Sequence, residues 1–199
     1  MRVILASGSP RRKEILSQAG VEFEICVSKK EEIITSDIPS EVVCELSKQK
    51  AEDVASGYNP NEVLVIGSDT VVSIDNEILG KPGDRADAFR MIKLLSGRKH
   101  QVYTGVTITY GAQSHTFYAI TDVCVRELTD DEINAYVDTD EPYDKAGAYA
   151  IQGIFAKFVS GIEGEYHNVM GFPIAKIYDE CKKKGIPLFE QPANGLHNF

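Results

Sequence analysis

Hydrophobic residues follow two patterns along this chain. Short apolar or alternating runs predict strands, whereas stripes that repeat every three or four positions predict helices. The predicted strands cover residues 2–5, 21–27, 62–66, 71–74, 100–110, 115–126 and 154–159. The predicted helices cover residues 10–19, 39–55, 85–95, 130–137 and 171–184. Strands and helices therefore alternate along the first half of the chain, and long strands dominate its middle.

The two longest predicted strands, 100–110 and 115–126, are separated by a Gly-Ala-Gln turn and predict an antiparallel hairpin. This antiparallel component disfavours a fully parallel doubly wound sheet, so we expect a mixed α/β fold. Residues 1–199 contain no repeat and no linker rich in Pro, Gly or Ser, which predicts a single domain. After Lys184 the pattern becomes irregular, and we expect this tail to pack loosely.

The segment 6–12, with the sequence Ala-Ser-Gly-Ser-Pro-Arg-Arg, joins the first strand to the first helix. Ser9 is a suitable N-cap and Pro10 a suitable first helical residue. Free N–H groups at the helix N-terminus attract anions, and Arg11 and Arg12 add positive charge, although cations in a first turn oppose the helix dipole. Because these arginines are unfavourable for the helix itself, their presence at a well-formed helix start indicates a role in ligand binding. The segment therefore predicts a phosphate site. A solvated basic turn is the alternative.

Carboxylates follow two of the predicted strands. Asp69 comes after the apolar strand 62–66 among small residues, and open α/β sheets place catalytic groups at such strand ends. A strand-end aspartate that caps a turn is the alternative interpretation. Glu31 and Glu32 follow the strand 21–27 and are candidate ligands of a divalent cation, or else part of a solvated charged loop.

Two lysines occupy unusual positions. Lys50 lies on the apolar stripe of the second predicted helix. Its aliphatic chain either packs on apolar surface while the ammonium group reaches the solvent, or the stripe borders a pocket and Lys50 reaches a phosphate. Lys81, between a glycine and a proline, is either an ordinary loop lysine or a positioned one. Residues 141–153 mix charged and small residues without a period, which predicts a loop that lines a ligand. His100 and His115 lie near strand ends, where we expect structural roles.

Composition narrows the classes of protein. The net charge of −9 disfavours a general nucleic-acid or membrane-surface binder, although it allows a local basic pocket. Cys26, Cys44, Cys124 and Cys181 are far apart without metal-site spacing, which predicts free thiols in a reducing compartment. The N-terminus has no signal pattern and no apolar run reaches membrane-spanning length, so we expect a cytoplasmic protein.

Six segments, in register along the chain, resemble the Maf family, the septum-formation-inhibitor-type nucleotide pyrophosphatases. They are residues 6–12, 67–72, 80–82, 95–102, 141–153 and 169–173. The resemblance extends from residue 1 to about residue 180 and implies an α/β fold with an elongated mixed β-sheet, flanking helices and two lobes around a cleft. It also implies a homodimer.

The resemblance implies a house-cleaning enzyme that hydrolyses nucleoside triphosphates between the α and β phosphates with a divalent metal, Mg²⁺ or Mn²⁺. Thr70 and Gln152 match the subgroup that prefers dTTP and UTP, since the 7-methyl-GTP subgroup has Gln and Glu there. The amide of Gln152 is suited to pair with the carbonyl and N–H edge of a pyrimidine. Ala150 stands where the family usually has Gly, and Phe172 where it usually has Leu; neither change removes a functional group.

The resemblance also assigns roles to individual residues. Catalysis of phosphoryl transfer is mostly positioning and charge neutralisation. Asp69 would activate water or hold the metal, Lys50 and Lys81 would neutralise charge, and Glu32 (or Glu31) would help to hold the metal. The implied substrate-binding residues are Ser7, Arg11, Arg12, Thr70, Asp144, Lys145 and Gln152, although Asp144 and Lys145 are also placed to pair with each other.

Two alternatives stay open at this point. One is a pyrophosphatase of the same family for another base, such as 7-methyl-GTP. The other is a non-enzymatic nucleotide-binding regulator of cell division, which would need the phosphate site but not the carboxylates Asp69 and Glu32. A phosphotransferase is disfavoured because the chain has no Walker-type Gly-x-x-x-x-Gly-Lys segment.

Overall fold

A computed structural model describes residues 1–190, and their strands form one seven-stranded mixed sheet. The strands are β1 (Arg2–Leu5), β2 (Glu24–Ile25), β3 (Val63–Ile74), β4 (Glu77–Leu79), β5 (Lys99–Tyr110), β6 (Gln113–Val125) and β7 (Val159–Glu163). Their order is β2-β1-β3-β5-β6-β7, and β4 pairs with β3. The β1 strand is parallel to β2 and β3, whereas β3, β5, β6 and β7 pair antiparallel.

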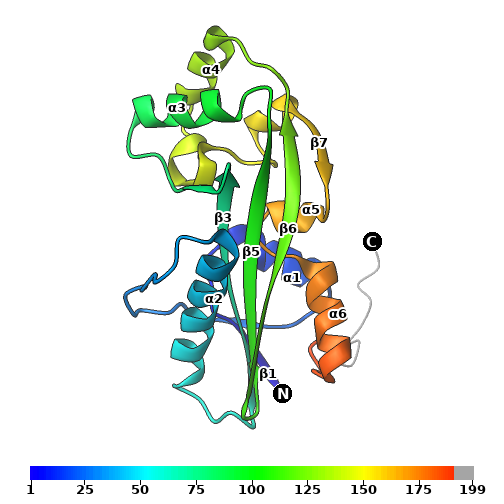
Figure 1. Ribbon diagram of the computed structural model, residues 1–199. Helices are drawn as coiled ribbons and strands as arrows, with labels where there is room; N and C mark the ends of the chain where they lie inside the picture. Colours follow the sequence, from blue (N-terminus) through cyan, green and yellow to red (C-terminus); the bar gives the residue numbers. More distant parts are fainter. Residues whose placement is uncertain (191–199) are drawn as a thin grey trace.

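The helices flank this sheet. They are α1 (Pro10–Gln18), α2 (Pro39–Ala55), α3 (Arg85–Leu95), α4 (Asp130–Val137), α5 (Tyr166–Val169) and α6 (Ile174–Lys184), with 3-10 turns η1 (Pro142–Asp144), η2 (Ala146–Ala148) and η3 (Ile154–Phe158). The long strands β3, β5 and β6 form the axis of an elongated molecule (Figure 1). The predicted elongated α/β fold with flanking helices is confirmed.

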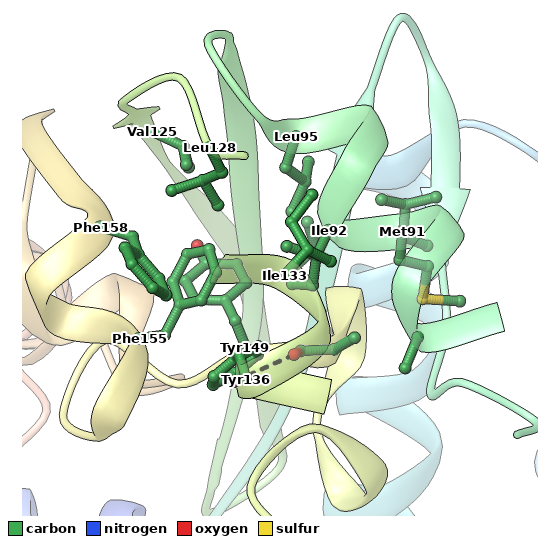
Figure 2. Close-up of a cluster of buried hydrophobic side chains, with 14 of the residues drawn as sticks. Met91, Ile92, Leu95, Val125, Leu128, Ile133, Tyr136, Tyr149, Phe155 and Phe158 are labelled. Atoms are coloured by element: carbon green, nitrogen blue, oxygen red, sulfur yellow. Dashed lines mark hydrogen bonds between the residues drawn. The ribbon is translucent and has the colours of Figure 1, made fainter. Parts of the chain in front are cut away.

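Two separate hydrophobic cores divide the molecule into two lobes. One lobe, here the β1 lobe, has a core around Leu5, Leu16, Ile66, Phe172 and Ile177. The other, the α3 lobe, buries the cluster drawn in Figure 2, which includes Ile92, Leu95, Ile133, Tyr136 and Phe155. In that core the Tyr136 hydroxyl donates a hydrogen bond of 3.1 Å to the Ala148 carbonyl. The same long strands pass through both lobes, so the lobes share one sheet.

Helix α2 lies directly against the sheet because two glycines give it room. A Cβ on Gly67 of β3 would lie 2.3 Å from the Ser47 carbonyl oxygen. A Cβ on Gly105 of β5 would lie 2.1 Å from the Val43 carbonyl oxygen. Only glycine permits such a close approach of helix backbone to strand backbone. This contact determines how far side chains of α2 extend over β3.

Four predicted strands differ from the observed elements. The predicted strand 21–27 is mostly loop, because β2 has a partner on one side only and covers just Glu24–Ile25. The predicted strand 154–159 is the 3-10 turn η3, in which Phe155 and Phe158 are buried three positions apart. The predicted strands 62–66 and 71–74 are one continuous strand, since β5 pairs with β3 throughout.

The end of the described chain packs more tightly than predicted. Ile186 and Leu188 are buried in the core of the β1 lobe, which the irregular pattern after Lys184 did not indicate. Residues 191–199 of the predicted loose tail lie outside the described residues. The four cysteines are free thiols, as predicted; Cys181 is buried and the others are half-buried. Among the described helices, none is long and apolar enough to cross a membrane.

Candidate active site

A cavity of about 590 Å³ opens where the two lobes meet. Its walls come from the start of α1, the middle of β3, the Lys81 segment, the loop 144–152 and residues 169–171. Eight of the predicted site residues line it: Arg11, Arg12, Asp69, Thr70, Lys81, Asp144, Lys145 and Gln152. The tertiary structure therefore brings together predicted site residues from four separate segments of the sequence.

A second cavity of about 220 Å³ adjoins the first and shares Gly8 and Arg12 with it. Ser7, Glu32 and Lys50 line this smaller cavity. Of the two candidate metal-binding glutamates, only Glu32 is among the described residues that line either cavity. All predicted site residues except the alternative Glu31 thus line these two adjoining cavities.

Lys50 lies between two carboxylates at the junction of the cavities. Its ammonium group pairs with Asp69 of β3 and lies 3.0 Å from Glu32 Oε1. The side chains of Lys50 and Asp69 are only 17% and 15% exposed, so this pair is largely shielded from water. Of the two sequence interpretations of Lys50, the structure supports the one in which it borders a pocket.

Asp69 does not lie at a strand end, which corrects the sequence prediction. It lies in the middle of β3, paired with Gly105 of β5. The parallel neighbour β1, however, ends at Leu5, opposite Ile66. Asp69 therefore lies just beyond the carboxyl end of β1, where parallel strands of α/β sheets present functional groups.

The Arg12 guanidinium connects three elements at the base of the cavity. Nε donates to the Gly171 carbonyl oxygen at 2.9 Å, and Nη1 donates to Ser7 Oγ at 3.1 Å and to the Ser68 carbonyl oxygen at 2.7 Å. Nη2 donates to Thr70 Oγ1 at 3.0 Å. Four of the five guanidinium N–H groups are thus engaged within the protein.

Burial lowers the pKa of Arg12, and the nearby Asp69 carboxylate opposes this shift. The guanidinium remains charged, because arginine does not lose its proton in proteins. The same side chain lines both cavities. Arg12 therefore presents a fixed positive charge to the hollow while most of its hydrogen bonds hold the walls together. Arg11, in contrast, has no resolved partner among the described residues and lines only the larger cavity.

Thr70 belongs to a chain of hydrogen bonds behind the cavity. Thr104 donates its hydroxyl proton to the Asn168 carbonyl oxygen at 3.1 Å. Thr70 must therefore donate to Thr104, 3.0 Å away, while it accepts from Arg12. This relay orients Thr70 and Arg12 together.

The loop 141–153 is held at two points, one beside β3 and one at the 3-10 turn η3. Gly147 approaches β3 so closely that a Cβ would lie 2.8 Å from Val72 Cγ1, and its N–H donates to the Gly80 carbonyl oxygen at 3.0 Å. The Glu141 carboxylate accepts from the N–H groups of Ile154 and Phe155 at 2.6 and 3.1 Å. The segment that the sequence predicted as a ligand-lining loop therefore lines the cavity with fixed contacts, and it contains the 3-10 turns η1 and η2.

Asp144 and Lys145 both line the larger cavity and pair with each other. The hydrogen bond from Lys145 lowers the pKa of the Asp144 carboxyl group. The Asp144 side chain is 73% exposed, whereas that of Lys145 is only 18% exposed. Lys145 is therefore the better placed of the two to face a ligand.

A family model described as Maf-like protein matches residues 2–184. The chain belongs to the Maf family. A Maf relative from Agathobacter rectalis is 52% identical over 93% of this chain and 98% of its own length, and one from Lachnoclostridium phytofermentans is 51% identical over 96% and 98%. Both relatives carry the name dTTP/UTP pyrophosphatase.

The Ham1 protein of Staphylococcus aureus has a similar structure, with a TM-score of 0.55 over 92% of this chain and 100% of its own. Because the two sequences are only 12% identical, this likeness concerns the fold alone. The recognition of a Maf fold from six short segments is confirmed.

Sequence reasoning missed the apolar wall of the cavity in this Maf protein. The wall consists of Val72, Val102, Tyr149, Val169 and Met170. Most of these residues belong to strands or loops whose apolar positions look like ordinary core residues. The one available signal was that all five residues fall inside segments that carry the family resemblance.

His100 supports this wall from behind. Its Nε2 lies 2.7 Å from the Tyr149 hydroxyl, and the ring is fully buried. His115 lies 2.8 Å from Glu180 Oε2, on α6. Neither histidine is among the described residues that line the cavities, in agreement with the structural roles that we expected.

The donor set for a divalent cation is small in this Maf protein. The described residues contain no group of three or more His, Cys, Asp or Glu side chains that would hold a metal by themselves. Asp69 and Glu32 supply two carboxylates, which Lys50 bridges. Protein sites for Mg²⁺ commonly have one or two carboxylates, with substrate phosphates as further ligands. The residues present therefore fit a cation that binds together with a phosphate ligand.

Proposed function

We propose that this protein is a nucleoside triphosphate pyrophosphatase that hydrolyses dTTP and UTP to the monophosphate and pyrophosphate. The observation that carries the proposal is the Asp69–Lys50 pair at the junction of two cavities that also contain Arg11, Arg12 and Lys81. The names of the relatives at about 50% identity support the same reaction and substrates.

The cations of the site would bind the phosphates. A triphosphate repels a nucleophile, and its leaving group must accept further negative charge, so positioned cations lower the barrier. Arg11, Lys81 and Lys145 line the larger cavity and would neutralise this charge. Arg12, held by the protein through four N–H groups, would contribute a fixed charge with one N–H free of these contacts.

Asp69 would orient the attacking water and accept its proton. The Lys50 ammonium group would hold the Asp69 carboxylate toward the cavity. In the balanced reaction the water oxygen adds to the α-phosphorus, the bond between the α-phosphorus and the bridging oxygen breaks, and pyrophosphate leaves with that oxygen. Ser7, whose hydroxyl accepts from Arg12 at 3.1 Å and from the Ser9 N–H at 3.3 Å, would shape the phosphate loop.

A divalent cation, Mg²⁺ or Mn²⁺, would be held by Asp69 and Glu32 together with phosphate oxygens of the substrate. When bound, it would supply further neutralisation of phosphate charge. Lys50 and the cation would then share the two carboxylates, since the Lys50 ammonium group pairs with both Glu32 and Asp69.

The base would pack on the apolar wall of the larger cavity. Tyr149, Val72 and Met170 offer flat or apolar surface there, and the exposed Gln152 lies on the same cavity. The Gln152 amide has one acceptor and two donors, which match the carbonyl and N–H edge of thymine or uracil. Thr70, turned toward Arg12 and Thr104, would act on the substrate through Arg12.

The remaining expectations concern the whole protein. We propose that residues 1–199 work as one domain, in a cytoplasmic homodimer, without nucleic acid or membrane as a partner. Sedimentation of the purified protein would measure the oligomeric state. A monomer at assay concentrations would exclude the homodimer and leave the proposed reaction untouched.

Pyrophosphate release from a panel of triphosphates tests the proposed function. The panel contains dTTP, UTP, CTP and 7-methyl-GTP, each with Mg²⁺, with Mn²⁺ and with a chelator. We expect rapid release from dTTP and UTP that stops with the chelator. Release mainly from 7-methyl-GTP would keep the reaction and reject the role of Gln152. Tight binding without release would instead indicate a nucleotide-binding regulator.

A further inference from the structure

An irregular segment lies along helix α2 and carries Glu32. Residues 28–36, here called the strap, connect β2 to α2 without helix or strand (Figure 1). The helix has an acidic or amide side chain at every fourth position: Glu41, Glu45, Gln49 and Asp53. Positions four apart lie on one face of a helix, so these four side chains form a single stripe.

The middle of the stripe binds the backbone of the strap. Gln49 Oε1 accepts from the Ile33 N–H at 2.9 Å, and Gln49 Nε2 donates to the Ile33 carbonyl oxygen at 2.6 Å. Glu45 accepts from the Thr35 N–H at 3.0 Å and from the Thr35 hydroxyl group. Gln49 thus pairs with both backbone groups of one residue, as a neighbouring strand would.

The two ends of the stripe bind the two ends of the strap. Asp53 accepts from Ser28 Oγ at 2.8 Å and from the Lys29 N–H at 3.3 Å, and its carboxylate lies 3.1 Å from Lys30 Nζ. At the other end Glu41 accepts from the hydroxyl group of Ser36 at 2.5 Å. The strap therefore runs antiparallel to α2 and is bonded at every turn of the helix.

The strap has little apolar attachment of its own. Ile33 and Ile34, its only large hydrophobic residues, are 64% and 55% exposed. A segment without buried apolar contacts opens easily unless its polar contacts hold it. The stripe of α2 side chains therefore determines where the strap lies.

The position of the strap matters for the site because of two neighbouring pairs. Glu32 precedes Ile33 on the strap, and Lys50 follows Gln49 on α2. The hydrogen bonds between Gln49 and Ile33 therefore lie beside the 3.0 Å contact between Glu32 and Lys50. Ser28, Lys30 and Glu32 of the strap also form one wall of the smaller cavity.

We propose that Gln49 is a positioning residue that holds the strap so that Glu32 reaches Lys50 and the metal-binding position beside Asp69. Gln49 is not among the described residues that line either cavity, so we expect it to act through Glu32. This inference rests on the proposed function, in which Glu32 helps to hold a divalent cation.

The test compares two matched substitutions on α2. Gln49→Met removes both hydrogen bonds to Ile33 and keeps the side-chain length and a high helix propensity. Glu52→Met is the control, since Glu52 lies on the exposed face of α2 and its side chain pairs, within residues 1–190, only with Lys48, at 3.9 Å. We expect Gln49→Met to raise the Mg²⁺ concentration for half-maximal pyrophosphate release about tenfold, as loss of outer contacts to a metal ligand typically does. Glu52→Met should leave it unchanged, and both variants should keep the thermal midpoint of the wild type.

Hydrogen exchange provides a readout that needs neither metal nor substrate. In Gln49→Met the amides of Ile33 and Thr35 should exchange faster than in the wild type, whereas Glu52→Met should not change them. Equal exchange and an equal Mg²⁺ requirement in Gln49→Met would overturn the proposal.

A double substitution separates positioning from a general structural effect. If Gln49 acts through Glu32, then Gln49→Met in a Glu32→Gln background should cause little further loss of activity. Fully additive losses would contradict the proposal. Absence of pyrophosphate release by the wild type would reject the proposed function instead, and the exchange of Ile33 and Thr35 would still decide whether Gln49 holds the strap.

Discussion

Single residues in this site combine structural and chemical tasks to different degrees. Arg12 donates four N–H groups to Ser7, Ser68, Thr70 and Gly171, so removing it would break four hydrogen bonds that join these residues. Lys50 pairs with two carboxylates at the edge of the hollow, where either pair can be exchanged for a ligand contact. The neighbours Arg11 and Arg12, adjacent in sequence, therefore differ in what their loss should do.

Replacing Asp69 by asparagine should abolish turnover and leave the fold intact. Removal of a group that accepts a proton in the transition state typically costs about 10² to 10⁴ in rate. Lys50 retains its contact with Glu32 in this variant, so no cation is left unpaired. Pyrophosphate release and thermal unfolding of Asp69→Asn would be measured beside Asp130→Asn, an exposed aspartate paired with Lys93. Wild-type turnover by Asp69→Asn would reject the assignment.

Substitution of the two arginines should separate stability from binding. Arg12→Ala removes four hydrogen bonds from a charged group and should lower the free energy of unfolding by at least about 2 kcal/mol. Arg11→Ala removes a residue at the cavity surface and should change it by less than about 0.5 kcal/mol while KM rises. Urea unfolding and steady-state kinetics of both variants would measure this. Equal stability losses would show that the described hydrogen bonds of Arg12 contribute nothing.

At the scale of elements, the site depends on how closely α2 approaches β3 and β5. Gly67 and Gly105 remove the side chains that would otherwise separate helix and sheet. The position of Lys50 over Asp69 follows from this contact, because both residues lie near it on α2 and β3. The polar face of α2, on the side away from the sheet, binds the strap through Glu45, Gln49 and Asp53 and so determines where the strap lies.

An alanine at Gly105 should push α2 away from the sheet. The new Cβ would lie 2.1 Å from the Val43 carbonyl oxygen, so helix or strand must shift. Such overpacking typically costs about 1–3 kcal/mol of stability. We expect Gly105→Ala to lose both stability and activity, because Lys50 moves relative to Asp69. Gly161→Ala is the control, since a Cβ there meets no heavy atom within 4 Å. An active, fully stable Gly105→Ala variant would contradict this account of the packing.

At the scale of the whole molecule, the cavity exists because one sheet passes through two lobes with separate cores. The apolar wall on the α3-lobe side is supported by the buried pair of His100 and Tyr149. Burial lowers the pKa of His100 to about 4, below the value of about 6.5 expected in the unfolded chain. Because the pKa of His100 differs between the folded and the unfolded protein, the free energy of unfolding depends on pH.

Between pH 6.5 and pH 4 the unfolded chain binds a proton at His100 that the folded protein does not bind. Stability therefore falls as the pH is lowered through this window, by about 2 kcal/mol between pH 7 and pH 5 from this residue. His100→Gln removes the titrating group and should show a smaller loss over the same interval. Urea unfolding of wild type and variant at both pH values would measure the difference. The same pH dependence in both proteins would show that His100 contributes nothing to it.

The sequence alone determined the local chemistry of this protein. Strand, helix and turn signals around residues 6–12, the helix over 39–55 and the hairpin of β5 and β6 depend on nearby residues, and all three were predicted correctly. The family resemblance then pointed to candidate residues that line the two cavities, all except Glu31, but it did not point to the apolar wall.

Only the tertiary structure decided which of these residues meet. It showed that Asp69 lies beside the end of a different strand, that Lys50 bridges two carboxylates, and that Arg12 is mostly engaged within the protein. It also replaced a predicted strand by the 3-10 turn η3, and it revealed the contacts of Gln49 with the strap. These features depend on contacts between residues far apart in the chain, and hydrophobic periodicity records only which face of an element is buried, not which element covers it.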